Sequence, residues 1–256
     1  MISPQAIVAP GARVAPDAEI GAFSIIGAEV EIGARTVVAP HVVINGHTRI
    51  GADNRIYQFS SIGEPPQDLK HKGEPTRLEI GDRNTIREYC TISCGTINDR
   101  AVTQIGDDNL LMAYTHVAHD CIVGNHVVMS NLAMIAGHVQ LDDWAILSGF
   151  SSVHQRVKIG AHAFIAHHAG CTKDVPPYVM AVGNPAEPHS INSEGLKRRG
   201  FTADQIRNLK NAYRVLYRSD LPLESAVEQL TQQAASQPEL DLLVKFIADS
   251  ERSIIR

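Results

Sequence analysis

Aliphatic residues recur at every sixth position along most of the chain. The series runs from residue 2 to residue 62, returns over residues 80–92, and continues in a shifted phase from residue 105 to residue 165. A period of six fits neither an amphipathic helix nor a two-faced strand, and it is typical of a hexapeptide parallel β-helix. We therefore predict about eight triangular coils of three hexads, spaced about 4.8 Å apart, with the aliphatic side chains forming an interior ladder.

Glycine often follows the aliphatic residue of a hexad. Because glycine adopts backbone angles that other residues avoid, we expect these glycines to serve the corners of the coils. The positions are Gly21, Gly27, Gly33, Gly51, Gly81, Gly106, Gly124 and Gly160.

Two stretches interrupt the hexads. Residues 63–79 are rich in proline, glycine and charge, and residues 94–104 break the period again. Both are predicted to be loops that leave a coil, and long loops on a rigid scaffold often carry function.

The hexads give way to helical patterns after residue 186. Thr202 and Gln205 predict a capping box for a helix that ends near Arg218. Other helical stretches are expected at residues 190–199, 222–236 and 238–252. The predicted organisation is a parallel β-helix over residues 1–186 and a small helical domain over residues 187–256.

The composition narrows the class of protein. The chain has 256 residues, of which 44% are hydrophobic and 5% aromatic, and this favours a sizeable aliphatic core. Its net charge of -5 lacks the basic excess of a nucleic-acid binder. We expect no signal peptide, because the start MISPQAIVAP has no basic n-region and no apolar h-region. We expect no transmembrane segment, because no apolar run approaches about 18 residues. The four cysteines form no C-x-x-C pair, so reduced thiols in a cytoplasmic protein are expected.

The stretch HVAHD, residues 116–120, brings two histidines and an aspartate together. In an 18-residue coil His119 stacks with Gly137 and then Gln155, while Asp120 stacks with His138. One edge of the prism is therefore expected to carry a dense polar column of His116, His119, Asp120, Gly137, His138, His154 and Gln155.

Three kinds of chemistry fit this column. A zinc site needs three ligands about 2.0–2.1 Å from one ion, and the column offers candidates but no diagnostic ligand motif. A nucleophilic triad needs an activated serine or cysteine beside the base, and nothing in the sequence marks Cys121 as activated. General-base catalysis needs one well-placed histidine and an electrostatic stabiliser, roles that suit His119 and the backbone N–H of Gly137.

Seven segments carry a resemblance to a known family. They are HVAHDCIVGNH, IAGHVQLDD, SSVHQ, NGHTRIGADNRIYQFSSIGE, QDLKHKGEPTRLEIGDRNTIRE, DVPPYV and INSEGLKRRGF. They closely resemble bacterial UDP-N-acetylglucosamine O-acyltransferases, in the same order and from the first coils into the C-terminal helices. The resemblance implies a left-handed β-helix and the first step of lipid A biosynthesis, in which acyl carrier protein donates a 3-hydroxyacyl chain directly to the 3-hydroxyl of UDP-N-acetylglucosamine.

The resemblance also implies roles for individual residues. His119 matches the general base of the family, and Gly137 matches the glycine of the oxyanion hole. Asp68 and Lys70, with Gln67 beside them, match residues that hold the sugar and phosphates. Positions that match the acyl and sugar pocket or the nucleotide-binding end are His116, His138, Gly149, His154, Gln155, Asn192, Glu194, Arg198 and Arg199. If the resemblance is set aside, a solvent-exposed C-terminal end of a helix explains Lys197, Arg198 and Arg199, because their positive charges interact favourably with the helix dipole there.

The family further implies a homotrimer with sites between subunits. The acidic acyl carrier protein would dock on a basic patch that includes some of these arginines. No metal is implied, and no cofactor other than the phosphopantetheine of the carrier protein.

Three departures from the family pattern bear on specificity. TISCGT replaces the usual TIHRGT, so Ser93 and Cys94 stand where the family has histidine and arginine. This change raises the alternative of a 3-amino sugar nucleotide as acceptor, which would give an amide. His167 occupies the position that sets acyl length, and its bulk predicts a short chain. The third departure, in the pocket region, is the run Ser130, Asn131 and Leu132 in place of a paired Asn-Asn.

Other functions remain open at this point. They are the later N-acyltransferase of the same pathway, a short-chain acetyl-CoA enzyme, a zinc-dependent hydratase on the same scaffold, and a non-catalytic scaffold or inactive paralogue. The QDLK and INSEGLKRR segments argue against the acetyl-CoA enzyme, and the retained HVAHD, QDLK and IAGH argue against the inactive protein.

Overall fold

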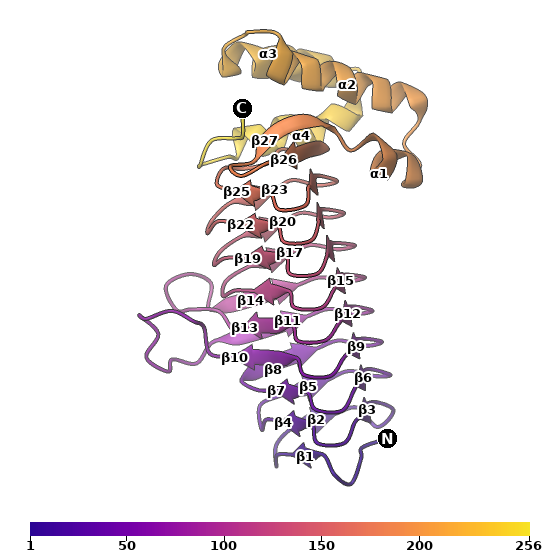
Figure 1. Cartoon of the computed structure of the whole chain (residues 1–256), viewed down its shortest axis with the longest axis vertical. Helices are drawn as coiled ribbons and strands as arrows, with labels where there is room; N and C mark the ends of the chain where they lie inside the picture. The colour runs from indigo at the N-terminus through magenta and orange to yellow at the C-terminus, as the bar shows by residue number, and fades with distance from the viewer.

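The computed structural model describes all 256 residues as a three-sided prism of stacked coils that ends in a group of helices (Figure 1). Each coil gives one short strand to each of three sheets, which we call the first, second and third faces. The faces contain 9, 8 and 10 strands, and only the last strand of the third face is antiparallel. The parallel β-helix followed by helices that the sequence predicts is therefore confirmed.

The strands are short because each hexad also has to form a turn. The first face contains β1 (Ile7–Val8), β4 (Ile25–Ile26), β7 (Val43–Ile44), β10 (Ser61–Glu64), β13 (Thr91–Ser93), β16 (His116–Val117), β19 (Met134–Ile135), β22 (Ser152–Val153) and β25 (Gly170–Cys171). The second face contains β2 (Arg13–Val14), β5 (Glu31–Ile32), β8 (His47–Ile50), β11 (Arg77–Ile80), β14 (Val102–Ile105), β17 (Ile122–Val123), β20 (Gln140–Leu141) and β23 (Lys158–Ile159). The third face contains β3 (Glu19–Ile20), β6 (Val37–Val38), β9 (Arg55–Ile56), β12 (Thr85–Ile86), β15 (Leu110–Leu111), β18 (Val128–Met129), β21 (Ile146–Leu147), β24 (Phe164–Ile165), β26 (Val179–Val182) and β27 (Glu187–Ile191).

Three edges join the faces. Edge A leads from the first face to the second, edge B from the second to the third, and edge C from the third to the first. In three successive coils edge A contains residues 118–121, 136–139 and 154–157, edge B contains 124–127, 142–145 and 160–163, and edge C contains 130–133, 148–151 and 166–169.

Paired strands keep the predicted register. His116 lies opposite Met134, 18 residues further on. Across the two loops the partners Ser61 and Thr91, and then Thr91 and His116, are separated by 30 and 25 residues without loss of pairing. The loops, residues 65–76 and 94–101, both leave at edge A, and they project together from one side of the prism (Figure 1). They are shorter than predicted because β11 and β14 begin inside the expected ranges.

The interior ladder forms as the hexads predict. Ile62, Ile135 and Leu147 are completely buried, and one aliphatic core runs through the prism. Ile2 is 47% exposed because no coil lies beneath it. Burial of an aliphatic side chain contributes roughly 1.5–3 kcal/mol, so the repeated ladder accounts for much of the stability of this fold.

The prediction for the glycines is wrong. Most corner residues with φ near +60° are not glycine, as Asp53, Arg83 and Asp108 show. Gly81 lies where two coils approach closely, and an added Cβ would be 2.8 Å from the carbonyl oxygen of Gly106. The absence of a side chain, rather than an unusual backbone angle, explains this glycine.

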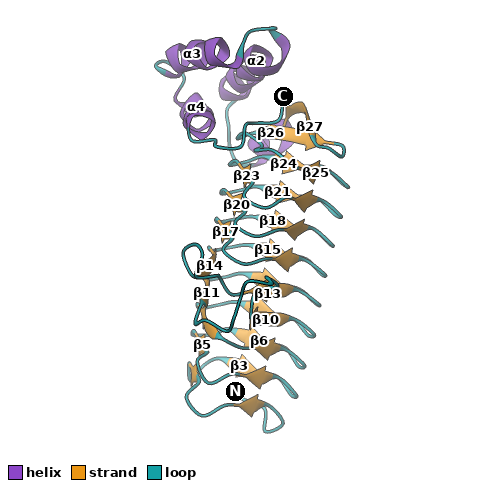
Figure 2. Cartoon of the chain, turned by 90° about the vertical axis from the view of Figure 1, so that its left-hand side faces the viewer, coloured by secondary structure: helices purple, strands orange, loops and turns teal.

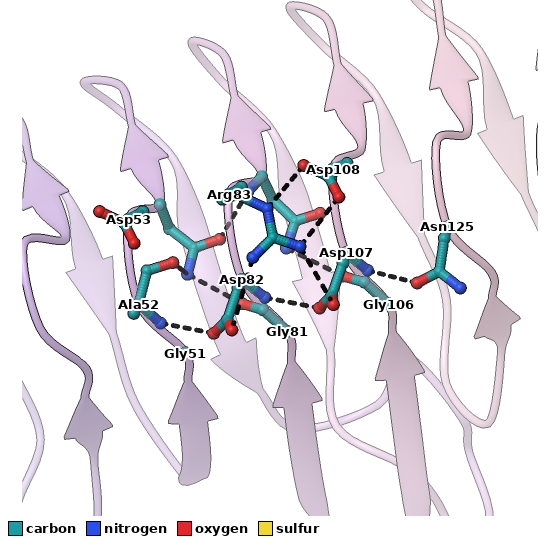
Figure 3. Close-up of polar contacts among 12 residues, drawn as sticks. Gly51, Ala52, Asp53, Gly81, Asp82, Arg83, Gly106, Asp107, Asp108 and Asn125 are labelled. Atoms are coloured by element: carbon teal, nitrogen blue, oxygen red, sulfur yellow. Dashed lines mark hydrogen bonds and ion pairs between the residues drawn. The ribbon is translucent and has the colours of Figure 1, made fainter.

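Side chains close edge B from coil to coil (Figure 3). The Oδ1 of Asp82 accepts from the Ala52 N–H at 2.7 Å, the Oδ1 of Asp107 accepts from the Asp82 N–H at 2.8 Å, and the Oδ1 of Asn125 accepts from the Asp107 N–H at 2.8 Å. This ladder caps backbone donors that a short strand leaves unpaired. It holds the coils in register at the edge opposite the first face.

The C-terminal part caps the prism. Strands β26 and β27 form an antiparallel pair on the third face, so the expected boundary at residue 186 falls in their connection. The helix predicted from residue 190 begins later because residues 187–191 pair as a strand. The helices are α1 (Ser193–Arg198), α2 (Ala203–Arg218), α3 (Leu223–Ala234), the short 3-10 helix η1 (Pro238–Leu240) and α4 (Asp241–Ala248).

The helices form their own core beyond the end of the prism (Figure 2). The predicted capping box of Thr202 and Gln205 is present at the start of α2. Tyr178 joins the two parts, because its hydroxyl donates to the Glu239 carbonyl oxygen at 2.9 Å. None of the helices is long and apolar enough to cross a bilayer.

Candidate active site

The predicted polar column forms at edge A. The His138 N–H donates to the His119 carbonyl oxygen at 3.0 Å, so these residues lie on adjacent coils. A Cβ added to Gly137 would lie 2.5 Å from Cε1 of His119, so glycine makes room for this imidazole ring. The 18-residue stacking of His119 on Gly137 is therefore confirmed.

A cavity of about 340 Å³ opens beside this column. It is lined by Gln67, Ser93, His116, Ala118, His119, Met134, Ile135, Ala136, Gly137, Ser152 and Val153. Gln67 reaches it from the loop of residues 65–76, and Ser93 reaches it from the end of β13. The structure thus brings five sequence-predicted residues to one hollow of the first face.

His119 is paired with a buried carboxylate. Its Nδ1 lies 2.9 Å from Oδ2 of Asp120, whose side chain is fully buried. The same carboxylate accepts from Thr96, from the backbone N–H at 2.9 Å and from Oγ1 at 2.6 Å. Burial raises the pKa of Asp120, but hydrogen bonds from His119 and Thr96 outweigh it and lower the pKa below its ordinary value. An ionised Asp120 holds the proton of His119 on Nδ1 and leaves Nε2 free to accept another.

Gly137 carries an uncommitted donor beside this imidazole. Its backbone N–H donates to no group of the chain, although the residue is buried. At edge B the corresponding N–H groups of Asp82 and Asp107 are each capped by a side chain of the next coil (Figure 3). The equivalent N–H groups of His119, Gln155 and Gly149 are also uncommitted, so Gly137 is distinguished by its place beside the His119 imidazole, where an N–H can stabilise a developing negative charge.

His138 has a carboxylate of its own. Its Nδ1 lies 2.5 Å from Oδ2 of Asp99 and 3.8 Å from Oδ2 of Asp120. Its ring stands edge-on to His119, with 5.1 Å between the ring centroids.

His116 completes the group of histidines. Its Nδ1 lies 2.7 Å from Oγ1 of Thr91. Burial, together with the neighbouring His119, lowers the pKa of His116. His116 is therefore neutral at neutral pH.

The nucleophilic alternative does not fit Cys121. All four cysteines are free and buried. Burial raises the pKa of Cys121 to about 12, and its thiol donates to the Ala136 carbonyl oxygen at 3.1 Å. A thiol that stays protonated is a poor nucleophile.

Three of these side chains also meet the spacing of a metal site. The ligand atoms of His119, Asp120 and His138 lie within 4.8 Å of one another. In the structure they are engaged with each other, with Thr96 and with Asp99. These bonds form two histidine–carboxylate pairs, an arrangement that suits proton transfer.

The remaining predicted residues lie outside this cavity. Asp68 and Lys70 belong to the loop of residues 65–76, where the Lys70 N–H donates to Oδ1 of Asp68 at 2.9 Å. His154 and Gln155 lie on edge A, one coil beyond Gly137. The side chains of both residues are exposed to solvent.

Gly149 and His167 meet each other at edge C. A Cβ added to Gly149 would lie 3.3 Å from Nδ1 of His167. Within one chain they are therefore separated from the His119 cavity by the width of the first face.

The predicted nucleotide-binding residues lie at edge B. Asn192 caps α1 and donates to the His162 carbonyl oxygen at 3.0 Å. Arg199 stacks over Trp144 at 5.1 Å from the ring centroid and is partly buried, whereas Glu194 and Arg198 are exposed. Predicted substrate-binding residues thus occupy all three edges of the prism.

A larger cavity of about 680 Å³ lies between the second face and α4. Among its lining residues are Asp142, Lys158, His162 and Phe246. Burial raises the pKa of Asp142 and lowers the pKa of His162 to about 4. No histidine–carboxylate pair lines this cavity, so the smaller one at edge A is the candidate active site.

Sequence reasoning missed two residues that orient the site and one contact of a third. Thr96 and Asp99 lie in the second loop, whose path over the coils no periodicity predicts. Asp120 was placed in the column by the arithmetic, but its bond to the adjacent His119 was not foreseen. The signal was present in the pair His-Asp itself, since a carboxylate next to a candidate base is a common orienting group.

Comparison with known proteins supports a single family. A family model for domain 2 of UDP-N-acetylglucosamine O-acyltransferases matches residues 174–255, and a model for bacterial transferase hexapeptide repeats matches residues 11–46 and 103–137. The acyl-[acyl-carrier-protein]–UDP-N-acetylglucosamine O-acyltransferase of Burkholderia lata is 54% identical over 210 residues, or 80% of each chain. That of Thiobacillus denitrificans is 54% identical over 203 residues, or 79% of each chain.

Solved structures agree over the full length of the chain. The UDP-N-acetylglucosamine acyltransferase of Francisella novicida has a TM-score of 0.98 and 44% identity, and the match covers 100% of this chain and 94% of that one. The O-acyltransferase of Moraxella catarrhalis has a TM-score of 0.97 and 46% identity, with coverage of 100% and 99%. Together, these relatives and the site at edge A lead to one conclusion: the chain belongs to the acyl-[acyl-carrier-protein]–UDP-N-acetylglucosamine O-acyltransferase family.

Proposed function

We propose that this protein transfers a 3-hydroxyacyl chain from acyl carrier protein to the 3-hydroxyl of UDP-N-acetylglucosamine, the first step of lipid A biosynthesis. One observation carries the proposal within the family. The His119–Asp120 pair and the uncommitted N–H of Gly137 lie in one cavity, where a base and an oxyanion donor are both needed. The substrates are cytoplasmic, so the enzyme is expected to work there.

The reaction follows from this geometry. Nε2 of His119 removes the proton of the sugar hydroxyl as the oxygen attacks the thioester carbonyl carbon. The C–O bond forms, and the carbonyl oxygen becomes an oxyanion that the Gly137 N–H stabilises. The C–S bond then breaks, and the proton on His119 passes to the departing phosphopantetheine sulfur. The ionised Asp120 stabilises the imidazolium between these steps.

The acceptor is held by groups around the cavity. Gln67 lines it, and the exposed Lys70 on the same loop offers a mobile charge to a phosphate. The neutral His116 supplies a hydrogen bond to the sugar or the acyl chain. His154 and Gln155 extend the polar edge by one coil.

A homotrimer explains why predicted substrate contacts occupy three edges. His119 lies at edge A, His167 at edge C and Arg198 beside edge B, and one chain cannot close them around one substrate. Cyclic symmetry brings an edge of one copy against a different edge of the next. In this arrangement Asn192, Glu194, Arg198 and Arg199 act on a neighbour's nucleotide. The carrier protein docks near the exposed basic end of α1.

The 3-amino sugar nucleotide is the second candidate acceptor. Ser93, at the position where the family usually has histidine, lines the cavity and is only 5% exposed. Compared with histidine, serine places only a small hydroxyl group on the acceptor side of the site, without an imidazole ring or a titratable group.

A competition assay tests both acceptors. The purified protein receives a series of 3-hydroxyacyl carrier-protein thioesters with equal amounts of UDP-N-acetylglucosamine and its 3-amino analogue, and mass spectrometry identifies the products. We expect the ester to dominate. A dominant amide product would assign the amine as the natural acceptor. No product from either, or stoichiometric zinc in the purified protein, would contradict the acyltransferase proposal.

A further inference from the structure

The second loop reaches across edge A and contacts both histidine–carboxylate pairs. Thr96 donates twice to Asp120, which orients His119. Three residues further along, Oδ2 of Asp99 lies 2.5 Å from Nδ1 of His138, 39 positions away in the sequence. The loop therefore fixes the orientation of His138 as well as that of the base.

The other nitrogen of His138 faces a cation. Nη2 of Arg156, one coil further on, lies 3.5 Å from Nε2 of His138, and Arg156 forms no salt bridge. A guanidinium has only donors, so it faces the lone pair of a neutral imidazole and repels an imidazolium. The carboxylate at Nδ1 and the guanidinium at Nε2 thus require the same tautomer, with hydrogen on Nδ1 and a lone pair on Nε2.

Asp120 cannot replace Asp99 in this role. It is 3.8 Å from Nδ1 of His138, and its Oδ2 is shared between His119 and Thr96. Only 12% of the His138 side chain is exposed, so the ring has little freedom to turn toward another partner.

We propose that Asp99 is a positioning residue for the acceptor, acting through His138. It holds the Nε2 lone pair of His138 beside the cavity, next to the His119 ring, where a hydroxyl or amide N–H of the sugar nucleotide replaces the Arg156 guanidinium as its donor. This inference rests on the proposed function. Asp99 touches neither the reacting carbonyl nor His119, so it affects binding of the acceptor rather than the chemical step.

Steady-state kinetics of Asp99→Ala tests the inference. We expect the KM for UDP-N-acetylglucosamine to rise about tenfold, while kcat and the KM for the acyl donor stay within about twofold. Asp99→Asn should recover most of this loss, because its amide oxygen still accepts from Nδ1–H. Asn98→Ala is the matched control in the same exposed loop and should behave like the parent protein.

A double-mutant cycle with His138 separates positioning from a general effect of the loop. If Asp99 acts through His138, Asp99→Ala has no further effect on a His138→Ala protein. Three results would each overturn the inference. They are additive effects of the two substitutions, an unchanged KM in Asp99→Ala, and a fall in kcat together with a lower melting temperature in Asp99→Ala.

Histidine ¹⁵N spectra keep the inference testable even if the proposed function fails. In the parent protein they should show His138 protonated at Nδ1 only, and Asp99→Ala should mix the two tautomers. A parent protein without activity but with this signature would refute the substrate assignment alone. An Asp99→Ala protein with the parent's spectrum would refute the role of Asp99 alone.

Discussion

Among single residues, His119 is distinguished by the difference between its two nitrogens. Nδ1 is bound to a buried carboxylate, and Nε2 has no partner in the chain. His116 and His138 also use Nδ1, but the first faces a hydroxyl and the second a loop carboxylate. The assignment of the base therefore rests on the burial and ionisation of Asp120.

His119→Ala should abolish turnover and leave the fold intact. General-base catalysis contributes about 10²–10⁴-fold, and the side chain takes no part in the interior ladder. The rate with saturating substrates and the melting temperature are the two measurements, with His41→Ala as a control far from the cavity. Near-normal turnover would show that another group removes the proton.

His167→Gly should shift the enzyme toward longer acyl chains. The imidazole fills space against Gly149 at edge C, and its removal opens room for further methylene groups. A roughly tenfold change in the ratio of kcat/KM for a longer and a shorter donor is expected. His168→Gly is the matched control, since the His168 ring stacks on Phe150, whereas the His167 ring meets Phe150 edge-on and packs against Gly149. An unchanged ratio would remove His167 from the pocket.

Among the elements, most two-residue strands of the coils have one inward and one outward residue. In β19 Ile135 is completely buried, whereas Met134 is 48% exposed. The fate of a charge introduced into the strand therefore depends on which of these two positions it takes.

Ile135→Asp should unfold the coil, because it buries a charge without a partner. We expect a loss of at least about 3 kcal/mol of unfolding free energy, measured by denaturant titration. Met134→Asp, on the same strand but facing out, should lose far less. Two equally stable variants would contradict the inward phase of Ile135.

The junction between prism and helices should be sensitive to acid. Burial and the neighbouring Arg199 guanidinium lower the pKa of His162 to about 4, against about 6.5 in an unfolded chain. Between these values the unfolded state binds more protons, so stability is full above pH about 6.5 and falls as the pH drops toward about 4. His162→Asn should reduce the fall in melting temperature over this window. His126→Asn, on the other side of Trp144, should not.

The hexad period was enough to predict the strands, their register and the stack of His119 on Gly137. These features depend on positions 18 apart, which sequence arithmetic gives directly. The arithmetic fails for Asp99, because inserted residues follow no period and their path depends on contacts at edge A. It also misjudged Gly81, since close approach of two coils is a three-dimensional property. The separation of Gly149 and Arg198 from His119 likewise appears only once the edges are known.

At the scale of the whole molecule, the prism divides its tasks among its edges. Edge B is closed by a ladder of aspartate and asparagine side chains, whereas edge A carries both loops, two histidine–carboxylate pairs and an uncapped N–H. Rigidity at edge B therefore permits variation at edge A, and in the proposed trimer a neighbouring copy completes the site.

Mixed trimers test this arrangement. His119→Ala and Arg198→Ala proteins are each expected to be weakly active, but they damage different edges. If a site takes His119 from one subunit and Arg198 from the next, random mixing by co-expression restores about a quarter of the parent activity. Mixtures no more active than their components would place both residues in the same subunit.

The regular register also sets a scale along the prism axis. Extra residues either leave the coil as a loop at an edge, as residues 65–76 and 94–101 do, or lengthen the prism by a whole coil of about 4.8 Å. His167 lies between two and three coils beyond His119, so the depth of the proposed acyl pocket depends first on the number of coils between them and then on the size of the side chain at position 167. Duplicating one coil between them would lengthen the accepted chain in a single step, with the residue at position 167 unchanged.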